Sequence, residues 1–536
     1  MPRIESSIIT EADSFRSNRA AHLALIEQFR ALENKVREAS AKSKAKFEKR
    51  GQLLPRDRVN LLLDRNAPFL ELSTLAGLGH HDDDGEKNVY GGGAIAGIGF
   101  VEGVRVMVFA SDAGIKGGSA HPLGIEKQLR AQDMAIENRL PYVQLVESAG
   151  ANLRLQAEMF VRGGRTFANL CRMSALGIPV LAVVHGSSTA GGAYQVGLAD
   201  YVVMIRKRSK VFLAGPPLLK AATGEIAIDE DLGGAELHVG ISGVGDYLAE
   251  NDADGIRIAR EIIGKLPWDR PQLAPRAQQP RYPAEELLGI VPPDHRTPYD
   301  VREVIARIVD DSAFLDFKAN YGEHTVCGHA RIEGQAVGIL GNNGPIDSPG
   351  ATKAAQFIQL CCQSGTPLLF LQNTTGFMVG AEAEQSGIVK HGSKMIQAVT
   401  NASVPKVTIQ LGASFGAGAY AMCGRSFGPR FIFSWPNNRI AVMGGEQAAK
   451  VLTIIAEDAA KGRGEEPDWE GMARLSESLV TQYDHESRAL FGTARLWDDG
   501  LIDPRDTRRV ISFCLATVLE GDARQLRPNS FGVARL

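Results

Sequence analysis

Two glycine-rich segments combine residue types that could stabilise an anion. Residues 186–194 read GSSTAGGAY and residues 412–420 read GASFGAGAY, and each follows a short apolar run. A strand ending in such a turn presents backbone N–H groups at the start of a helix, where unpaired donors and the helix dipole favour negative charge. Only very small residues let a ligand approach so closely. The turn could therefore form a phosphate cradle or an oxyanion hole for an enolate or tetrahedral oxygen.

The second segment also matches two other motifs. Residues 412–416 fit GxSxG, which would make Ser414 the nucleophile of a serine hydrolase, but residues 186–190 of the first segment break this pattern. Residues 416–421 resemble a dinucleotide-binding turn, yet the acidic residue expected about 20 positions later is missing. Paired oxyanion holes are favoured because they explain why the feature occurs twice.

These segments belong to a long internal repeat. Residues 177–194 align with residues 403–420 at a constant offset of 226, and the same offset aligns residues 139–151 with 365–377. At other offsets FLEL (69–72) is similar to FLDF (314–317), and FVEG (100–103) is similar to RIEG (331–334). These strings occur in the same order in both halves. The repeat predicts two homologous domains.

The elements that must position the turns follow an α/β pattern. Residues 94–111 predict two strands joined at Glu102-Gly103, and the apolar runs 142–148, 179–186 and 201–205 alternate with helical patterns. Eight prolines between Leu266 and Pro298 predict a linker. We expect domains at residues 1–280 and 281–536.

Composition excludes several classes of protein. Lys and Arg number 59 against 62 Asp and Glu, and hydrophobic residues make up 44% of the 536 residues. These values argue against a disordered chain and against a basic nucleic-acid partner. Six cysteines without a CxxC pair predict neither a disulfide framework nor a metal site. Without a long apolar run or a signal-like N-terminus, we expect a soluble, cytoplasmic protein with no membrane partner.

Nearly the whole chain, from residues 49–64 to 491–508, resembles the carboxyltransferase (β) subunits of biotin-dependent acyl-CoA carboxylases. The strings that carry the resemblance are DAGIKGG (112–118), STAGGAY (188–194), FLAGPPLLKAATGE (212–225), LQNTTGFMVG (371–380) and MGGEQAA (443–449). The resemblance implies an α/β fold of two homologous crotonase-like domains in tandem, of the ClpP/crotonase superfamily.

The resemblance also implies where each reactant binds. The first domain would bind the acyl-CoA thioester, with the amides of Gly191 and Gly192 on its enolate oxygen. The second would bind carboxybiotin, with the amides of Gly418 and Ala419 on its ureido oxygen. Further acyl-CoA contacts are expected at Lys116, Gly117, Gly118, Gly150, Ala151, Gly163, Gly164 and Ala193, and biotin contacts at Thr374, Thr375, Gly376 and Phe377. Catalysis would need no side-chain nucleophile, because preorganised N–H donors stabilise both anions.

A partner chain is implied by what the sequence lacks. It has no Met-Lys-Met biotin attachment sequence and no glycine-rich ATP-binding module. We therefore expect a biotin carboxylase/biotin carrier α subunit that carries biotin covalently and uses ATP and bicarbonate. The family builds its active site between domains of different subunits, which implies a homohexameric core and an α6β6 complex.

Within the family, the chain looks most like the methylcrotonoyl-CoA and geranyl-CoA carboxylases, which carboxylate the γ carbon of a branched 2-enoyl thioester. Methylcrotonoyl relatives carry a bulky aromatic residue where this chain has Gly163, and they have VPA where residues 195–197 read QVG. Loss of an aromatic ring makes room for a longer acyl chain. We expect geranyl-CoA as substrate, with 3-methylcrotonyl-CoA (leucine degradation), a serine hydrolase and a non-catalytic scaffold as alternatives.

Overall fold

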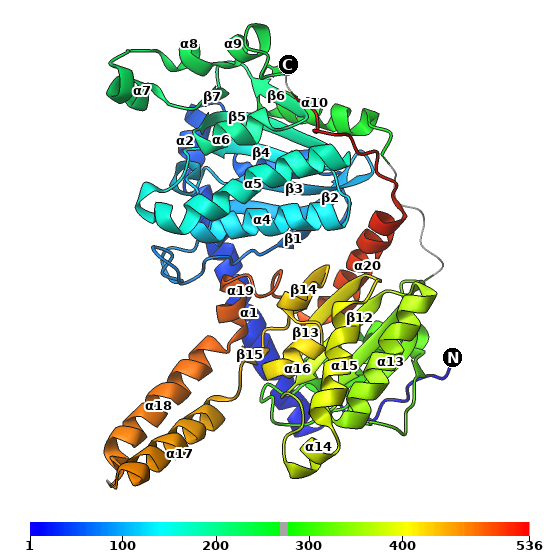
Figure 1. Ribbon diagram of the computed structural model, residues 1–536. Helices are drawn as coiled ribbons and strands as arrows, with labels where there is room; N and C mark the ends of the chain where they lie inside the picture. Colours follow the sequence, from blue (N-terminus) through cyan, green and yellow to red (C-terminus); the bar gives the residue numbers. More distant parts are fainter. Residues whose placement is uncertain (269–276, 465, 535–536) are drawn as a thin grey trace. The chain divides into compact units, whose positions relative to one another are not determined.

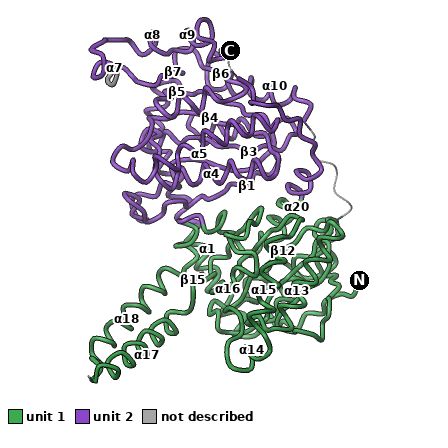
Figure 2. Tube along the Cα trace, viewed as in Figure 1, with its two compact units in different colours: residues 1–29, 274–493, 497–515 green, residues 30–273, 494–496, 516–536 purple. Residues whose placement is uncertain are grey.

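Each half of the chain is built around its own mixed sheet. The computed structural model describes residues 1–268, 277–464 and 466–534. The chain divides into two compact units, residues 1–29, 274–493 and 497–515 in one and residues 30–273, 494–496 and 516–536 in the other (Figure 2). We call the unit around residues 30–273 the first domain and the other the second domain. Helices α1 (Asp13–Ala41) and α20 (Thr507–Ala523) contribute residues to both.

The sheet of the first domain has the order β1-β2-β3-β4-β5-β6-β8, with β7 beside β5 (Figure 1). Strands β1 to β3 pair antiparallel, and the strands from β3 onwards pair parallel. The strands are β1 (Leu70–Leu72), β2 (Ala94–Val101), β3 (Val104–Ser111), β4 (Tyr142–Ser148), β5 (Val180–Thr189), β6 (Tyr201–Ile205), β7 (Lys210–Phe212) and β8 (Tyr247–Ala249). The central strands begin with mostly apolar residues because helices cover both faces of a parallel sheet.

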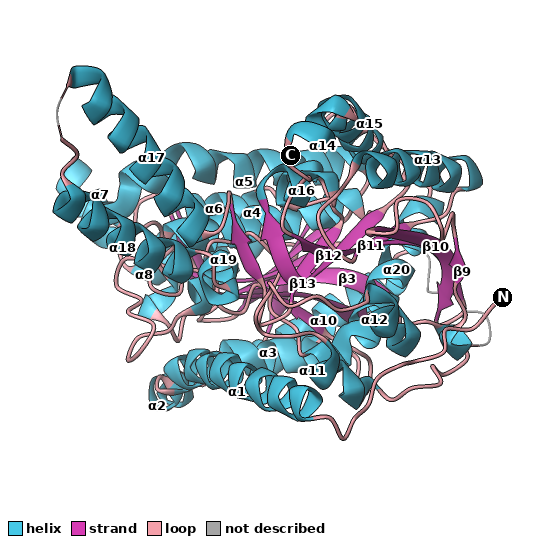
Figure 3. Cartoon of the chain, turned by 90° about the horizontal axis from the view of Figure 1, so that it is seen from below, coloured by secondary structure: helices cyan, strands magenta, loops and turns pink. Residues whose placement is uncertain are grey.

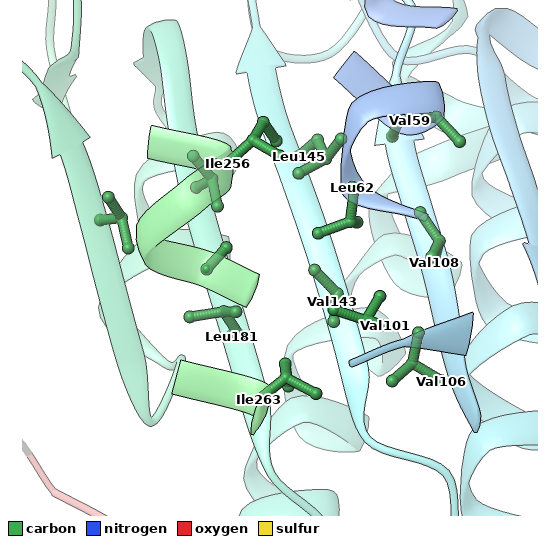
Figure 4. Packing of buried hydrophobic residues seen from close by; sticks show 14 of the residues in the cluster. Val59, Leu62, Val101, Val106, Val108, Val143, Leu145, Leu181, Ile256 and Ile263 are labelled. Carbon is green, nitrogen blue, oxygen red and sulfur yellow. The ribbon is translucent and has the colours of Figure 1, made fainter. Parts of the chain in front are cut away.

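Helices α4 and α5 cover one face of this sheet, and α3 and α10 pack on the other (Figure 1). On the second face, Val59 and Leu62 of α3 and Ile256 of α10 meet Val143 and Leu181 in one buried cluster (Figure 4). The helices are α2 (Lys44–Lys49), α3 (Pro55–Leu62), α4 (Pro122–Glu137), α5 (Gln156–Leu176), α6 (Gly191–Gly197), α7 (Pro216–Thr223), α8 (Asp229–Gly233), α9 (Ala235–Gly240) and α10 (Asp252–Lys265).

The second domain repeats this plan, with the sheet order β14-β13-β12-β11-β10-β9 and β15 beside β13. Its strands are β9 (Leu315–Asp316), β10 (Thr325–Ile332), β11 (Gln335–Asn342), β12 (Leu368–Thr374), β13 (Lys406–Phe415), β14 (Phe431–Ser434) and β15 (Arg439–Ala441). The antiparallel pairs again come first along the chain, and the parallel pairs follow.

Helices α13 and α15 lie on one side of these strands and α12 on the other (Figure 3). Asp347 caps the start of α13 by accepting a hydrogen bond from the amide of Gly350, and Gly365, with a φ of 67°, ends it. The helices are α11 (Leu287–Ile290), α12 (Val301–Ile308), α13 (Ser348–Ser364), α14 (Ala381–Gln385), α15 (Ile388–Thr400), α16 (Gly416–Ala421), α17 (Gly445–Arg463), α18 (Trp469–Glu486) and α19 (Ala489–Ala494). None of the helices in the described segments is long and apolar enough to cross a membrane.

The structure confirms the predicted α/β class and the repeat. The turn at Glu102-Gly103 has φ values of 51° and 76° and joins two antiparallel strands, as predicted. The offset of 226 relates β4 to β12 and β5 to β13 along their full lengths. Both pairs of strands also contain the same irregularity, because the register of β4 on β5 shifts between Val146 and Ser148 and that of β12 on β13 between Gln372 and Thr374.

The boundary between the two units falls inside the proline-rich stretch, as predicted, but the downstream part of the stretch differs from a linker. Leu287, Leu288 and Ile290 of α11 are buried in the second domain, as is Val291. An apolar run of this kind gains stability by burial, so the downstream part of the stretch belongs to the core. The two units divide between residues 273 and 274. Pro271 and Pro275 lie outside the described residues.

Candidate active site

In the first domain, β5 runs into a turn that leaves two backbone donors unused. The amide of Ala190 donates to the carbonyl of Phe212 at 3.1 Å, and the amide of Ala193 donates to the carbonyl of Ala190 at 3.1 Å. Between them, the amides of Gly191 and Gly192 have no acceptor within the described parts of the chain. This is the arrangement that an oxyanion hole requires.

The glycines of this turn leave no room for side chains. A Cβ atom on Gly192 would lie 3.1 Å from the Cβ of Ser148, and one on Gly191 would lie 3.1 Å from a ring carbon of Phe167. The turn therefore packs between the end of β4 and helix α5. Gly191 and Gly192 are needed for this close approach.

The end of β4 brings further predicted residues to the turn. Gly150 has a φ of 84°, and a Cβ there would lie 3.6 Å from the hydroxyl of Thr189. Ala151 forms a parallel bridge with Ala120. Gly118 approaches the carbonyl of Glu147 so closely that any side chain would clash. Gly118, Gly150 and Ala151 thus gather where β4 and β5 end.

Lys116 is directed elsewhere. Its Nζ forms an ion pair with the carboxylate of Asp82 and lies 4.7 Å from the centre of the Tyr90 ring. Partial burial lowers the pKa of Lys116. Gly117, between Lys116 and Gly118, has open space where a side chain would be. The structure therefore shows Lys116 holding the loop around residue 82.

Gly163 and Gly164 lie in the middle of α5. A Cβ on either would meet nothing within 4 Å. Helical periodicity places Gly163 on the same face as Phe167, the residue whose ring approaches Gly191. Two adjacent glycines in a helix cost about 1 kcal/mol each relative to alanine, and what they provide here is open space beside the turn.

The strand ends of the first domain are held by buried charges. Arg58 donates to Glu147 at 2.7 Å and to Asp252 at 3.1 Å, and Asp252 also contacts Nδ1 of His185 at 2.9 Å. Burial lowers the pKa of His185, which favours its neutral form. In the second domain the residue equivalent to Glu147 is Asn373, whose Oδ1 accepts from the amide of Ala413 at 3.0 Å. Each network fixes the strand that leads into a turn.

The second domain forms an equivalent turn. The amide of Gly418, which is equivalent to that of Gly192, has no acceptor among the described residues. A Cβ on Gly418 would lie 2.8 Å from the Cα of Gly376, so two backbones are in direct contact. The hydroxyl of Thr374 lies 3.2 Å from both the amide nitrogen and the carbonyl oxygen of Gly376 and holds this residue in place.

Thr375 and Phe377 have different surroundings. Thr375 and Phe415 line a cavity of about 590 Å³ that is bounded also by His295 and Arg439. In contrast, the ring of Phe377 packs against Gly392 of α15 and joins the hydrophobic core. The structure therefore places Thr375 at an open site and the Phe377 ring in the core.

Ser414 does not have the surroundings of a nucleophile. Its side chain is fully buried, and its Oγ accepts a hydrogen bond from Nε2 of Gln410 at 3.0 Å. Among the described residues no histidine is hydrogen-bonded to it. A serine nucleophile needs an adjacent base and access to substrate. The structure does not support the hydrolase alternative.

Sequence reasoning missed the residues behind the turns. Gln144 on β4 and Gln372 on β12 are buried and donate hydrogen bonds to carbonyls of α6 and α16. Phe167, which covers Gly191, was also missed. A signal existed, because a glutamine within an apolar strand is unusual, but the sequence does not show which group it meets.

Comparison with known proteins agrees with this geometry. The family model described as the carboxyl transferase domain matches residues 46–532. A probable biotin-dependent acyl-coenzyme A carboxylase beta2 subunit of Mycobacterium tuberculosis is 50% identical over 489 residues, covering 91% of each chain. A probable methylcrotonoyl-CoA carboxylase beta chain of Drosophila melanogaster is 46% identical over 555 aligned residues, covering 99% of this chain and 95% of the relative.

A solved structure is similar over the full length of both chains. It is the crystal structure of the beta subunit of P. aeruginosa geranyl-CoA carboxylase, with 58% sequence identity and a TM-score of 0.94. Identity of this degree over nearly all of the sequence establishes common ancestry. The resemblance predicted from the sequence is therefore confirmed, and the chain belongs to the carboxyltransferase (β) subunits of biotin-dependent acyl-CoA carboxylases.

Proposed function

We propose that the protein transfers CO2 from carboxybiotin, carried by a partner subunit, to the γ carbon of geranyl-CoA. The observation that supports this most is the pair of equivalent turns, in which the amides of Gly192 and of its counterpart Gly418 have no acceptor among the described residues. The reaction passes through two anions, one on each reactant. One preorganised oxyanion hole for each anion would lower the barrier without any side-chain nucleophile.

The first domain would bind the acyl-CoA. The amides of Gly191 and Gly192 would donate to the thioester oxygen as it gains charge in the enolate. Residues around this turn would contact the rest of the substrate, namely Lys116, Gly117, Gly118, Gly150, Ala151 and Ala193. In this role Lys116 would have to exchange its ion pair with Asp82 for a phosphate of coenzyme A. The domain that binds the acyl-CoA is expected at residues 1–280.

The second domain, expected at residues 281–536, would hold the biotin ring. The ring fits in chemical terms, because its ureido oxygen is an acceptor and the amide of Gly418 is a donor that has no acceptor among the described residues. The amide of Ala419 would be the second donor. Thr374, Thr375 and Gly376 would form the adjoining wall, and Phe377 would have to move its ring out of the core to join it. Bound carboxybiotin supplies CO2 and, once decarboxylated, a basic nitrogen for the substrate proton. The chain's own residues hold both oxygens and exclude water.

The open face of α5 supports a long acyl group. Gly163 and Gly164 leave space next to Phe167, and Phe167 covers Gly191. An aromatic side chain at residue 163 would fill that space. The similar P. aeruginosa protein is a geranyl-CoA carboxylase subunit. The Drosophila relative is named for methylcrotonoyl-CoA, so 3-methylcrotonyl-CoA is the alternative substrate.

The assembly proposed is a complex of six β chains with six α chains. Carboxylase β subunits of this family work with a biotin-carrying α partner, which here would use ATP and bicarbonate to form carboxybiotin. As the family resemblance implies, a domain of another copy would complete each active site.

The test is incorporation of labelled bicarbonate by the purified complex, offered acetyl-, propionyl-, 3-methylcrotonyl- and geranyl-CoA. We expect geranyl-CoA to be preferred. Gly163→Phe should lower kcat/KM for geranyl-CoA at least tenfold and leave 3-methylcrotonyl-CoA unaffected or improved, since a phenyl ring is worth several kcal/mol of packing. Gly462→Phe is the control, because Gly462 lies in α17 and also has open space around it. Equal loss of both substrates would contradict the role of Gly163.

A further inference from the structure

In each domain a buried glutamine is hydrogen-bonded to the helix that follows the turn. Nε2 of Gln144, on β4, donates to the carbonyl of Gln195 in α6 at 3.2 Å. Nε2 of Gln372, on β12, donates to the carbonyl of Ala419 in α16 at 3.0 Å. Both glutamine side chains are buried, with exposures of 1% and 0%. In each domain the strand that precedes the turn strand therefore makes a direct polar contact with the turn helix.

In the second domain the contact extends into a relay of side chains. Oε1 of Gln372 accepts from Nε2 of Gln410 at 3.0 Å, and the same Nε2 also donates to Oγ of Ser414. Oε1 of Gln410 accepts from Oγ of Ser434 at 2.7 Å. The relay thus runs from β14 through β13 and β12 to the carbonyl of Ala419.

Burying these polar side chains in a sheet costs more free energy than burying apolar side chains would. A buried amide must satisfy its hydrogen bonds, whereas a leucine or methionine of similar size would need none. A chain of hydrogen-bonded amides holds each side chain in a single orientation, because each donor and acceptor is bonded to the neighbouring side chain. The group at its end is the carbonyl of Ala419, and the preceding residue, Gly418, carries an amide that has no acceptor among the described residues.

We infer that Gln372 is a positioning residue for the carboxybiotin turn. Gln144 contacts α6 from a non-equivalent position of β4, two residues further along the turn helix than Gln372 does in α16. The inference rests on the proposed function, since it assumes that the turns bind the two reacting oxygens. Gln372 touches neither reactant. It holds the carbonyl of Ala419, and with it the start of α16, so that the amide of Gly418 keeps one orientation.

The substitution Gln372→Glu tests this through proton donation. An ionised glutamate has no proton to give to the carbonyl of Ala419, whereas a protonated one does. Burial raises the pKa of a glutamate at this position, and the recorded partners of Gln372, the Gln410 amide and the Ala419 carbonyl, are uncharged. The variant complex should therefore lose kcat about tenfold at alkaline pH and recover as the pH falls.

Two further variants separate positioning from folding. Gln372→Met removes the donor at every pH, so its kcat should be about tenfold low throughout, with the same factor for geranyl-CoA and 3-methylcrotonyl-CoA. Gln359→Glu is the matched control, because Gln359 is exposed on α13 and also donates to a backbone carbonyl, that of Ala355 at 3.1 Å. Its profile of kcat against pH should follow the wild type.

The outcomes are distinct. Wild-type kcat in both Gln372 variants, or a loss in Gln372→Glu that does not depend on pH while its thermal unfolding matches the wild type, would overturn the positioning role. If Gln372→Glu does not fold, the isosteric Gln372→Met decides the question through kcat alone. Absence of bicarbonate incorporation by the wild-type complex would instead refute the proposed function.

Discussion

Ala190 and Gly416 occupy the same backbone position in the two domains, with φ values of 52° and 55°. Each residue follows the strand that leads into the turn and precedes the residues whose amides are free to bind an oxyanion. Glycine adopts a positive φ readily, whereas a non-glycine residue pays on the order of 1 to 3 kcal/mol. The first domain thus stores backbone strain where the second domain does not.

Ala190→Gly should relieve this strain. We expect the variant to raise the free energy of unfolding by about 1 kcal/mol, because the gain in the folded state exceeds the added entropy of the unfolded chain. Chemical denaturation of the purified subunit measures it. Ala168→Gly in the interior of α5 is the control and should destabilise by about 1 kcal/mol. A lower stability of Ala190→Gly would show that the alanine is not strained.

Gly418→Ala should damage the second turn. The new Cβ would lie 2.8 Å from the Cα of Gly376, and backbone cannot rotate away as a side chain can. We expect kcat of the complex to fall on the order of 100-fold for every acyl-CoA, because a displaced donor is lost to the transition state. The control is Gly462→Ala, which has free space in α17. Near wild-type carboxylation by Gly418→Ala would remove this turn from the mechanism.

Ser414→Ala should leave carboxylation within a few-fold of the wild type. The hydroxyl is buried and accepts from Gln410, so its removal costs about 1 kcal/mol of stability but no chemistry. A fluorophosphonate probe should not label the wild-type protein. Labelling at Ser414, together with loss of activity in the alanine variant, would restore the hydrolase alternative.

Asp498 should make stability depend on pH. Burial raises its pKa to about 6, despite the hydrogen bonds from Thr493 and from the amide of Gly500. An unfolded aspartate titrates near 3.9. Between about pH 4 and pH 6 the folded state therefore binds more protons than the unfolded state, so this carboxyl increases stability as the pH falls through that window and lowers it above pH 6.

Asp498→Asn removes this titration. We expect the variant to be more stable than the wild type at pH 8, by an amount on the order of 2 kcal/mol, and to lose the gain between pH 6 and pH 4. The midpoint of urea unfolding as a function of pH measures both effects. Parallel curves for variant and wild type across this range would contradict the raised pKa.

The amino-acid sequence alone determined the fold class, the repeat and the two glycine-rich turns. Strands β4 (Tyr142–Ser148) and β6 (Tyr201–Ile205) occupy the predicted residues because short apolar runs between helical patterns have few other ways to fold. The two turns could be predicted because small residues directly after a strand determine the local backbone conformation. The long family-like strings identified the relatives, which the comparisons confirmed.

Only the tertiary structure decided where the side chains point. It pairs Lys116 with Asp82, packs the ring of Phe377 on Gly392 and buries Leu287 within a stretch that reads as a linker. It also brings Gln372 to the carbonyl of Ala419. These contacts join residues far apart in the sequence, so their energies depend on how the strands and helices pack together. A local pattern of residue types sets the backbone of each element but cannot specify such partners.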